Sequence, residues 1–143
     1  MKSKTLATWV ALVGGSLGLH RFYLHGFGDR WGWLFPLPTL VGLYGVQRMR
    51  DFGQDDQLAW LLVPLLGVML AAGMLSAIVI GLTADDAWHA RFNPRGPLVA
   101  SGWAAIFGVM LALLVGAGVL MATIAFSGQR YFEYEQLSRP SSR

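Results

Sequence analysis

Two uninterrupted apolar runs constrain the fold of this chain more than any other feature of its sequence. Leu58–Leu82 contains 25 residues without a charged side chain, and Leu98–Gln129 contains 32. A helix of about 20 apolar residues crosses the hydrocarbon core of a lipid bilayer. Each run is therefore long enough to form a transmembrane helix, and the excess residues of the second run would tilt that helix or extend beyond the lipid.

Two shorter apolar segments precede these runs. Thr5–Leu19 has 15 uncharged residues and Trp31–Gln47 has 17. At about 1.5 Å per residue, such helices reach roughly 22–26 Å, which is less than the roughly 30 Å of hydrocarbon. Local thinning of the bilayer can absorb the difference, and we expect both segments to cross as a short hairpin. A re-entrant or interfacial hairpin is the alternative.

The composition agrees with a membrane protein. Hydrophobic residues make up 55% of the chain and charged residues 13%, with a mean hydropathy of +0.49. Soluble domains carry about 25% charged residues, so this chain has roughly half of the usual supply. We therefore predict an all-α integral membrane protein with four transmembrane helices. Residues 1–55 form the hairpin, residues 56–129 the second pair of helices, and residues 130–143 a cytoplasmic tail that is partly disordered.

Lysines and arginines orient this arrangement and argue against a nucleic-acid partner. They lie singly or in pairs between apolar runs, which is typical of membrane-flanking charges. With four crossings, one face would carry seven of them and the other four, so the excess of basic residues predicts that both termini are cytoplasmic. The first group is Lys2, Lys4, Arg48, Arg50, Arg130, Arg139 and Arg143; the second is Arg21, Arg30, Arg91 and Arg95.

Small residues, tryptophans and prolines add detail to the predicted helices. Ala7, Ala11, Gly14 and Gly18 form a stripe at helical spacing that would let another helix approach closely. This stripe favours a retained helix over the alternative of a signal peptide cleaved near residue 15. Tryptophans near the segment ends predict an interfacial belt; they are Trp31, Trp33, Trp60, Trp88 and Trp103. Prolines should kink or unwind their helices; they are Pro36, Pro38 and Pro64.

The N-terminal third of the chain carries a recognisable motif. Glycines are followed by the string His20-Arg21-Phe22-Tyr23-Leu24, and an aspartate follows the second apolar segment. Over Lys4–Phe52 this pattern resembles the TM-two domain family, small and often bacterial proteins built on a two-helix transmembrane hairpin. The resemblance implies a hairpin in the bacterial inner membrane and supplies no reaction. In some relatives the hairpin loop is placed in the cytoplasm, opposite to the orientation that the basic residues predict. The motif residues are Gly15, Gly18, His20, Arg21, Phe22, Tyr23 and Asp51.

The three histidines, His20, His25 and His89, fall in the loops that four crossings would bring to one face. With Asp85 and Asp86, they could bind a divalent metal or respond to pH. Asp85 and His89 are four residues apart, so a helical turn would place them side by side. However, the chain has no HExxH or comparable metal-binding spacing. Ordinary loop residues are therefore the favoured interpretation, and we expect no cofactor.

Arg21 ends the first apolar segment and has two types of candidate partner. A long arginine side chain can extend to the lipid phosphates and anchor the helix end. Alternatively, its guanidinium can pair with a carboxylate, and Asp29 and Asp51 are the candidates. We favour the lipid anchor.

The sequence predicts a non-enzymatic function. It has no Ser/His/Asp or Cys/His arrangement and no phosphate-binding loop. The two long runs hold no ionisable residue, which argues against a transporter with a charged midplane site. We expect a scaffold, accessory or stress-related membrane factor that contacts the lipid bilayer, other copies of the chain or another membrane protein, and no nucleic acid. The alternatives are a small oligomeric channel or permease and a metal- or pH-responsive sensor.

Overall fold

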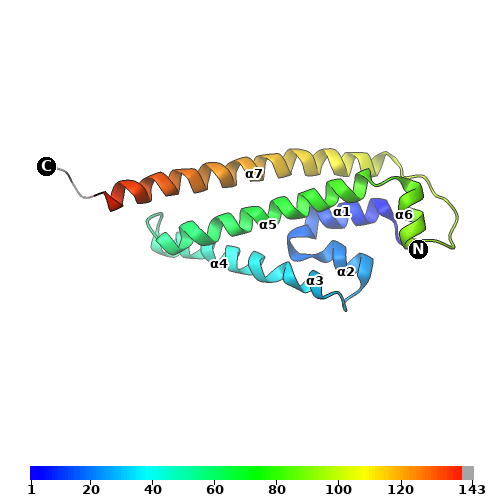
Figure 1. Ribbon diagram of the computed structural model, residues 1–143, viewed down its shortest axis with the longest axis horizontal. Helices are drawn as coiled ribbons and strands as arrows, with labels where there is room; N and C mark the ends of the chain where they lie inside the picture. The colour runs from blue at the N-terminus through cyan, green and yellow to red at the C-terminus, as the bar shows by residue number, and fades with distance from the viewer. Residues whose placement is uncertain (140–143) are drawn as a thin grey trace.

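The computed structural model describes residues 1–139, and these form an elongated bundle of helices without a strand (Figure 1). The predicted all-α class is therefore confirmed. The elements are α1 (Lys4–Gly14), the 3-10 turn η1 (Gly15–Leu17), α2 (Leu19–His25), α3 (Arg30–Leu34), α4 (Pro36–Phe52), α5 (Gln57–Leu82), α6 (Asp85–Phe92) and α7 (Trp103–Ser138).

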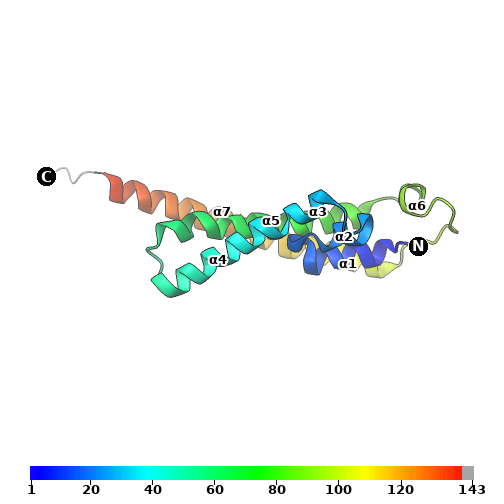
Figure 2. The same cartoon turned by 90° about the horizontal axis from the view of Figure 1, so that it is seen from below.

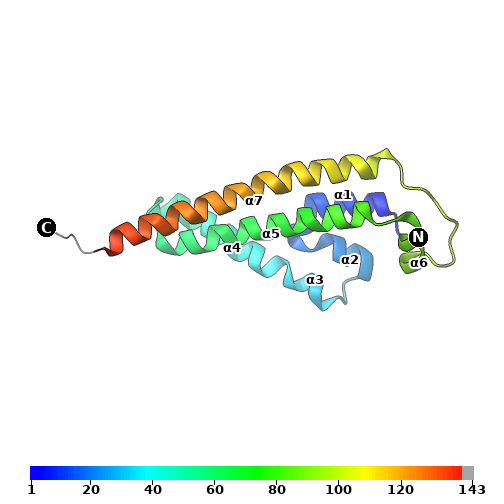
Figure 3. The same cartoon turned by 45° about the horizontal axis from the view of Figure 1, so that its top comes forward.

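The two long apolar runs form α5 and α7, which lie side by side in all three views (Figures 1 to 3). Both helices are long and apolar enough to cross a membrane. Glycines bring them together, since a Cβ atom on Gly116 would lie 2.8 Å from the Cβ of Met74. Helix α7 begins at Trp103 instead of Leu98 and continues to Ser138, through the first part of the expected tail. Residues 140–143 of that tail lie outside the described residues.

The first apolar segment reverses direction instead of forming one helix. Helix α1 ends at Gly14, and Gly18 adopts the left-handed conformation, with φ 73° and ψ 14°. Helix α2 then returns toward the end of the molecule where α1 began (Figure 2). There, the Ser3 amide donates a hydrogen bond of 3.0 Å to the Tyr23 hydroxyl. The expectation of a single helix over Thr5–Leu19 is therefore wrong, because the chain reverses within this segment.

The second apolar segment remains helical, although the pattern of helical backbone hydrogen bonds is interrupted at Phe35, between α3 and α4. Pro36 is the first residue of α4, a position where a missing N–H costs little. Phe35 keeps helical angles, φ −70° and ψ −44°, so α3 and α4 continue in one direction. Together they span residues 30–52, which at about 1.5 Å per residue is roughly 34 Å. The prolines therefore interrupt hydrogen bonds here without producing a turn.

The two termini of the described chain lie at opposite ends of the bundle (Figure 1). At the α6 end, the Lys2 amide donates to the Asn93 side chain at 2.8 Å. At the other end, which we call the α4–α5 end, the Arg130 guanidinium of α7 lies 5.2 Å from the ring of Trp60 in α5. This arrangement of residues 1–139 differs from the one behind the prediction that both termini share one face, because the first segment turns back. Arg143, which was counted for that prediction, lies outside the described residues.

The buried core lies where α1 packs against α5 and α7. Ala7 and Ala11 of the predicted stripe are fully buried, and Gly14 is buried with them. Thr8 is also fully buried, and its hydroxyl donates to the Lys4 carbonyl at 2.9 Å. Gly18, the fourth member of the stripe, lies beyond the helix at the reversal. The two alanines of the stripe are therefore buried against α5 and α7, whereas Gly14 lies against Leu19 of α2.

Candidate functional site

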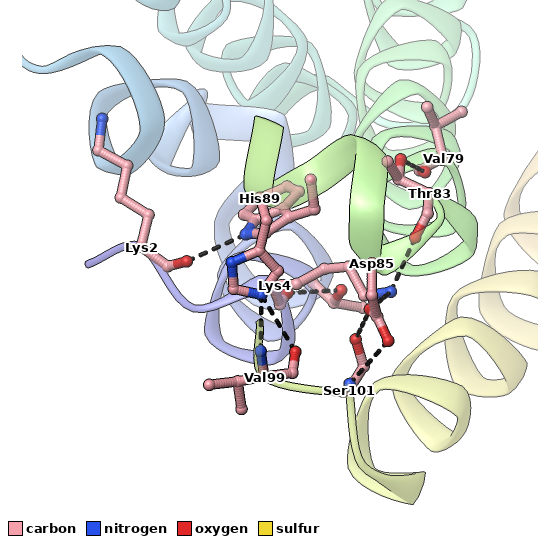
Figure 4. A network of polar contacts seen from close by, with 10 residues as sticks. Lys2, Lys4, Val79, Thr83, Asp85, His89, Val99 and Ser101 are labelled. Atoms are coloured by element: carbon pink, nitrogen blue, oxygen red, sulfur yellow. Dashed lines mark hydrogen bonds and ion pairs between the residues drawn. The ribbon is translucent and has the colours of Figure 1, made fainter. Parts of the chain in front are cut away.

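Helix α6 and the chain around it close the α6 end of the bundle, and most of the long-range polar contacts of the molecule gather here (Figure 4). Asp85 and Asp86 occupy the first turn of α6, and His89 and Arg91 the last. This order of charges complements the helix dipole. It supports a helix of only eight residues, which then offers its polar side chains to two other segments.

Asp85 joins α6 to both α1 and the segment before α7. Its carboxylate lies 2.6 Å from the Lys4 ammonium, which also donates to the Thr83 carbonyl at 2.7 Å. It accepts a hydrogen bond of 2.9 Å from the Ser101 amide and another from the Ser101 hydroxyl (Figure 4). Bonding to Lys4, then to Ser101, holds the pKa of the Asp85 carboxyl well below its usual range. The carboxylate is therefore held ionised as a structural anchor.

His89 lies beside Asp85 on one face of α6, as their spacing predicts, and binds the same segment. The Val99 amide donates to its Nε2 at 3.1 Å, while its Nδ1 is buried without a partner among residues 1–139. Asp85 and His89 therefore hold the extended segment Val99–Ser101 against α6. This contact explains why α7 begins only at Trp103.

The N-terminal residues are held by the other side of α6. The Lys2 carbonyl accepts hydrogen bonds from the Trp88 indole at 3.0 Å and from the Asn93 amide group at 2.9 Å. Trp88 is 3% exposed, so the prediction that it belongs to an interfacial belt is wrong. A cavity of about 170 Å³ remains between residues 1–5, α6 and Val99–Ser101. We call this arrangement the clasp: α6 and Asn93 bind Lys2 and Lys4 on one side and Val99–Ser101 on the other. The clasp fixes the start of the chain to the loop before α7.

The motif residues of the first hairpin hold that hairpin together. His20 packs its ring edge-on against Phe35, with centroids 5.6 Å apart. Arg21 donates from Nε to the Asp29 carboxylate at 2.8 Å, so one of the two carboxylates considered for it is its partner. This bond lowers the pKa of Asp29.

The other motif residues divide between the hairpin and the far end of α4. The ring of Phe22 lies against Gly32, where a Cβ atom would come within 2.7 Å of it. The Tyr23 hydroxyl accepts the hydrogen bond from Ser3 already described. Asp51 lies exposed near the end of α4, apart from the other motif residues. Gly15 lies at the tip of the hairpin.

The five candidate metal ligands do not form one cluster. Within residues 1–139, no group of three or more His, Asp or Glu side chains is arranged to hold a metal ion. His20 contacts Phe35, His89 contacts Val99, and His25 lies 4.0 Å from Asp29. Asp86 is exposed and Asp85 is bound to Lys4 and Ser101. His25 and His89 lie in or against α6, whereas His20 lies at the start of α2.

Sequence reasoning missed the roles of Lys2, Lys4 and Asn93. The two lysines carried only the signal of membrane-flanking charge, and Asn93 carried none. Their partners are far away along the chain, in and around α6, so no local pattern indicates the pairing. None of the family models, curated proteins or solved structures compared with the chain matches it, so the resemblance to the TM-two domain family stays a prediction.

Proposed function

We propose that the protein is a non-enzymatic, multi-pass protein of the cell membrane that acts through contacts with lipid and with other membrane proteins, as a scaffold or accessory subunit. The observation that carries this proposal is the exposed apolar surface of α5 and α7. In the most apolar 18-residue windows of these helices, only 11% and 22% of residues are buried within the bundle. Core helices of soluble proteins are mostly buried, whereas helices that are apolar on all sides and exposed are stable in lipid.

In this proposal the chain crosses the bilayer three times. The crossings are α3–α4, α5 and α7, each of which is long enough to span the hydrocarbon core. The hairpin α1–η1–α2 enters from the α6 end, reaches Gly73 near the middle of α5 and leaves on the same side. Its reversal lies against α5, which agrees with the rule that irregular backbone at membrane depth is buried in protein.

The basic residues then favour a cytoplasmic α6 end. Six Lys and Arg residues lie toward this end and four toward the α4–α5 end within residues 1–139. The first group is Lys2, Lys4, Arg21, Arg30, Arg91 and Arg95; the second is Arg48, Arg50, Arg130 and Arg139. Because cytoplasmic segments carry the excess, this end faces the cytoplasm. The hairpin loop then has the orientation that the resemblance to the TM-two domain family implies.

Close helix packing supports a contact role over a transport role. A Cβ atom on Gly42 of α4 would lie 2.6 Å from the Cβ of Leu66 in α5, and one on Gly108 of α7 would lie 2.9 Å from Thr8 in α1. Helices that pack this closely leave little room for a path between them. The polar side chains Asp85, His89 and Asn93 already bond to the N-terminal residues or to the segment before α7. The outer surface is therefore where this protein meets its partners.

Fractionation and flux measurements test the proposal. The full chain should remain in the membrane pellet after an alkaline carbonate wash, because α5 and α7 cross the bilayer. Purified protein in sealed liposomes should give no flux of K⁺, Cl⁻ or H⁺ above that of empty liposomes. Release of the chain by carbonate would contradict the membrane assignment. Flux that scales with the amount of protein would contradict the scaffold and favour the channel.

A further inference from the structure

A crevice between α2, α5 and α6 lies beside the clasp, shares Trp88 with it and carries a further inference. Its volume is about 360 Å³, which falls within the range of roughly 300–1,000 Å³ typical of small-molecule pockets. Leu75 and Val79 of α5 form an apolar wall and are 61% and 59% exposed, so the crevice opens onto the outer surface of α5. Its lining also includes His20 and Arg21 of α2 and Arg91 of α6.

The polar lining of this crevice favours an anion. Arg91 is exposed and forms no ion pair among residues 1–139, while its guanidinium lies 5.4 Å from the ring of Phe92. Arg21 uses Nε to bind Asp29, and His25 also lies next to that carboxylate. Of the two arginines that line the crevice, Arg21 is paired with a carboxylate and Arg91 is not, so the lining keeps an excess of positive charge within residues 1–139. Arginine is the side chain best suited to bind a phosphate group.

His20 provides an independent sign of a missing partner. Its side chain lines the crevice, the residue is only 5% exposed, and its Nδ1 has no hydrogen-bond partner among the described residues. Buried polar atoms nearly always have a partner, and an unpaired one costs about 1–3 kcal/mol. A ligand atom in the crevice would supply the partner that the protein does not.

The lining of the crevice combines the two kinds of surface that a phospholipid contacts. Its apolar wall lies on α5, and its cationic groups lie on α2 and α6. From Leu75 to Thr83 the helix rises roughly 12 Å, which is comparable to half of one lipid leaflet. We propose that this crevice binds one anionic phospholipid, with its phosphate at Arg91, Arg21 and His20 and an acyl chain along Leu75 and Val79. This inference rests on the proposed membrane function.

Native mass spectrometry of the full chain released from detergent micelles tests the inference. The probes are dioleoyl phosphatidylglycerol, dioleoyl phosphatidylcholine and inorganic phosphate. The wild-type chain should retain one phosphatidylglycerol molecule with an affinity about tenfold above that for phosphatidylcholine, the ratio expected from one charge-assisted contact. Inorganic phosphate alone should bind far more weakly, because it makes no contact with the apolar wall.

Three variants locate the site. R91Q should lower the affinity for phosphatidylglycerol on the order of tenfold. R30Q is the matched control, since Arg30 is an exposed arginine toward the same end that does not line the crevice. V79W should fill the apolar part and reduce retention, whereas L82W, on an exposed position of the same helix outside the crevice, should not.

Several results would overturn the inference. Equal retention of phosphatidylglycerol and phosphatidylcholine would contradict the headgroup preference. Equal losses of phosphatidylglycerol affinity in R91Q and R30Q would contradict the location of the site. Binding of inorganic phosphate as tight as that of the lipid would leave an anion site without a lipid role. If these results occur in a chain that resists the carbonate wash, only this inference fails. Release of the chain by carbonate would contradict the proposed function itself.

Discussion

Gly15 and Gly73 meet backbone to backbone at the tip of the first hairpin. A Cβ atom on Gly15 would lie 2.6 Å from the Cα of Gly73, and one on Gly73 would lie 2.8 Å from the amide nitrogen of Ser16. Non-bonded carbon atoms prefer separations of roughly 3.5–4.0 Å. The hairpin therefore reaches α5 only because both positions lack a side chain, and this contact fixes where the chain reverses.

Replacing Gly73 by alanine should destabilise the protein. Alanine favours a helix over glycine by about 1 kcal/mol, so on propensity alone the variant would be more stable. The clash with Gly15 and Ser16 should reverse the sign and lower the free energy of unfolding by about 1–3 kcal/mol. Unfolding in mixed micelles with increasing SDS, followed by circular dichroism, measures this change.

Gly118→Ala is the matched control for this substitution. Gly118 lies within α7, and nothing lies within 4 Å of a Cβ atom placed there. We expect this variant to be neutral or slightly stabilised. Equal effects of G73A and G118A would contradict the close contact at the hairpin tip.

Gly18→Ala should destabilise the reversal between η1 and α2. A left-handed residue other than glycine costs roughly 1–2 kcal/mol. In addition, its Cβ atom would lie 2.6 Å from the Gly32 carbonyl oxygen. We expect a clear drop in the midpoint of thermal unfolding in detergent. Gly28→Ala, at a position with open space and no positive φ, should leave that midpoint nearly unchanged.

The Lys4–Asp85 ion pair should make stability depend on acid pH. Because the pKa of Asp85 is lowered in the folded state, the unfolded chain binds more protons as pH falls. The contribution of this carboxylate is fully present above pH about 5. It is lost as pH falls below the ordinary value of about 3.9 toward the folded pKa. The difference in unfolding midpoint between the wild type and an Asp85→Asn variant should therefore be constant from pH 7 to 5 and shrink below that.

Asp85→Asn should lower the unfolding midpoint at pH 7 and make the decline below pH 5 shallower. Part of the decline should remain, because the pKa values of Asp29 and Asp56 are also lowered, mainly by their bonds to Arg21 and Arg48. Asp86→Asn, at an exposed position of the same helix turn, is the control and should follow the wild-type curve. If D85N and the wild type decline in parallel, Asp85 is not responsible.

Asn93→Ala should loosen the start of the chain. The Asn93 side chain is 7% exposed and both accepts from and donates to the backbone of Lys2. Removing it leaves the half-buried Lys2 amide unpaired, while the Lys2 carbonyl keeps the Trp88 indole as its partner, so the variant should lose about 1 kcal/mol. Hydrogen exchange of the amides of residues 2–8 should rise in this variant. Unchanged exchange there would mean that Asn93 does not hold the N-terminus.

Local sequence patterns were sufficient for the long helices. The run Leu58–Leu82 differs from α5 by one residue at its start, because an apolar stretch of that length has few alternatives. The i, i+4 spacing of Asp85 and His89 correctly placed them side by side. For α7, the predicted start was early because Asp85 and His89 bind Val99–Ser101 in an extended form.

The hairpin and the clasp depend on contacts between distant residues, which local patterns do not reveal. The sequence does contain a signal for a helix break, since Gly14 and Gly15 are adjacent and Gly18 follows shortly after. We interpreted these glycines as helix-packing residues only. The approach of Gly73 decides that the chain turns at this place, and it comes from the middle of α5. In the same way, Lys4 binds Asp85 only because α1 begins at the end of the bundle where α6 lies.

The account depends most on the hairpin returning to the α6 end, so that the N-terminus and α6 share one side of the membrane. Because the chain has no cysteine, single cysteines can be placed in a short extension before Met1, at Ala87 and at Leu137. A membrane-impermeant maleimide should then be applied to sealed vesicles of known orientation. We predict that the N-terminal cysteine and A87C are labelled from one side and L137C from the other. Labelling of the N-terminal cysteine from the same side as L137C would contradict the account.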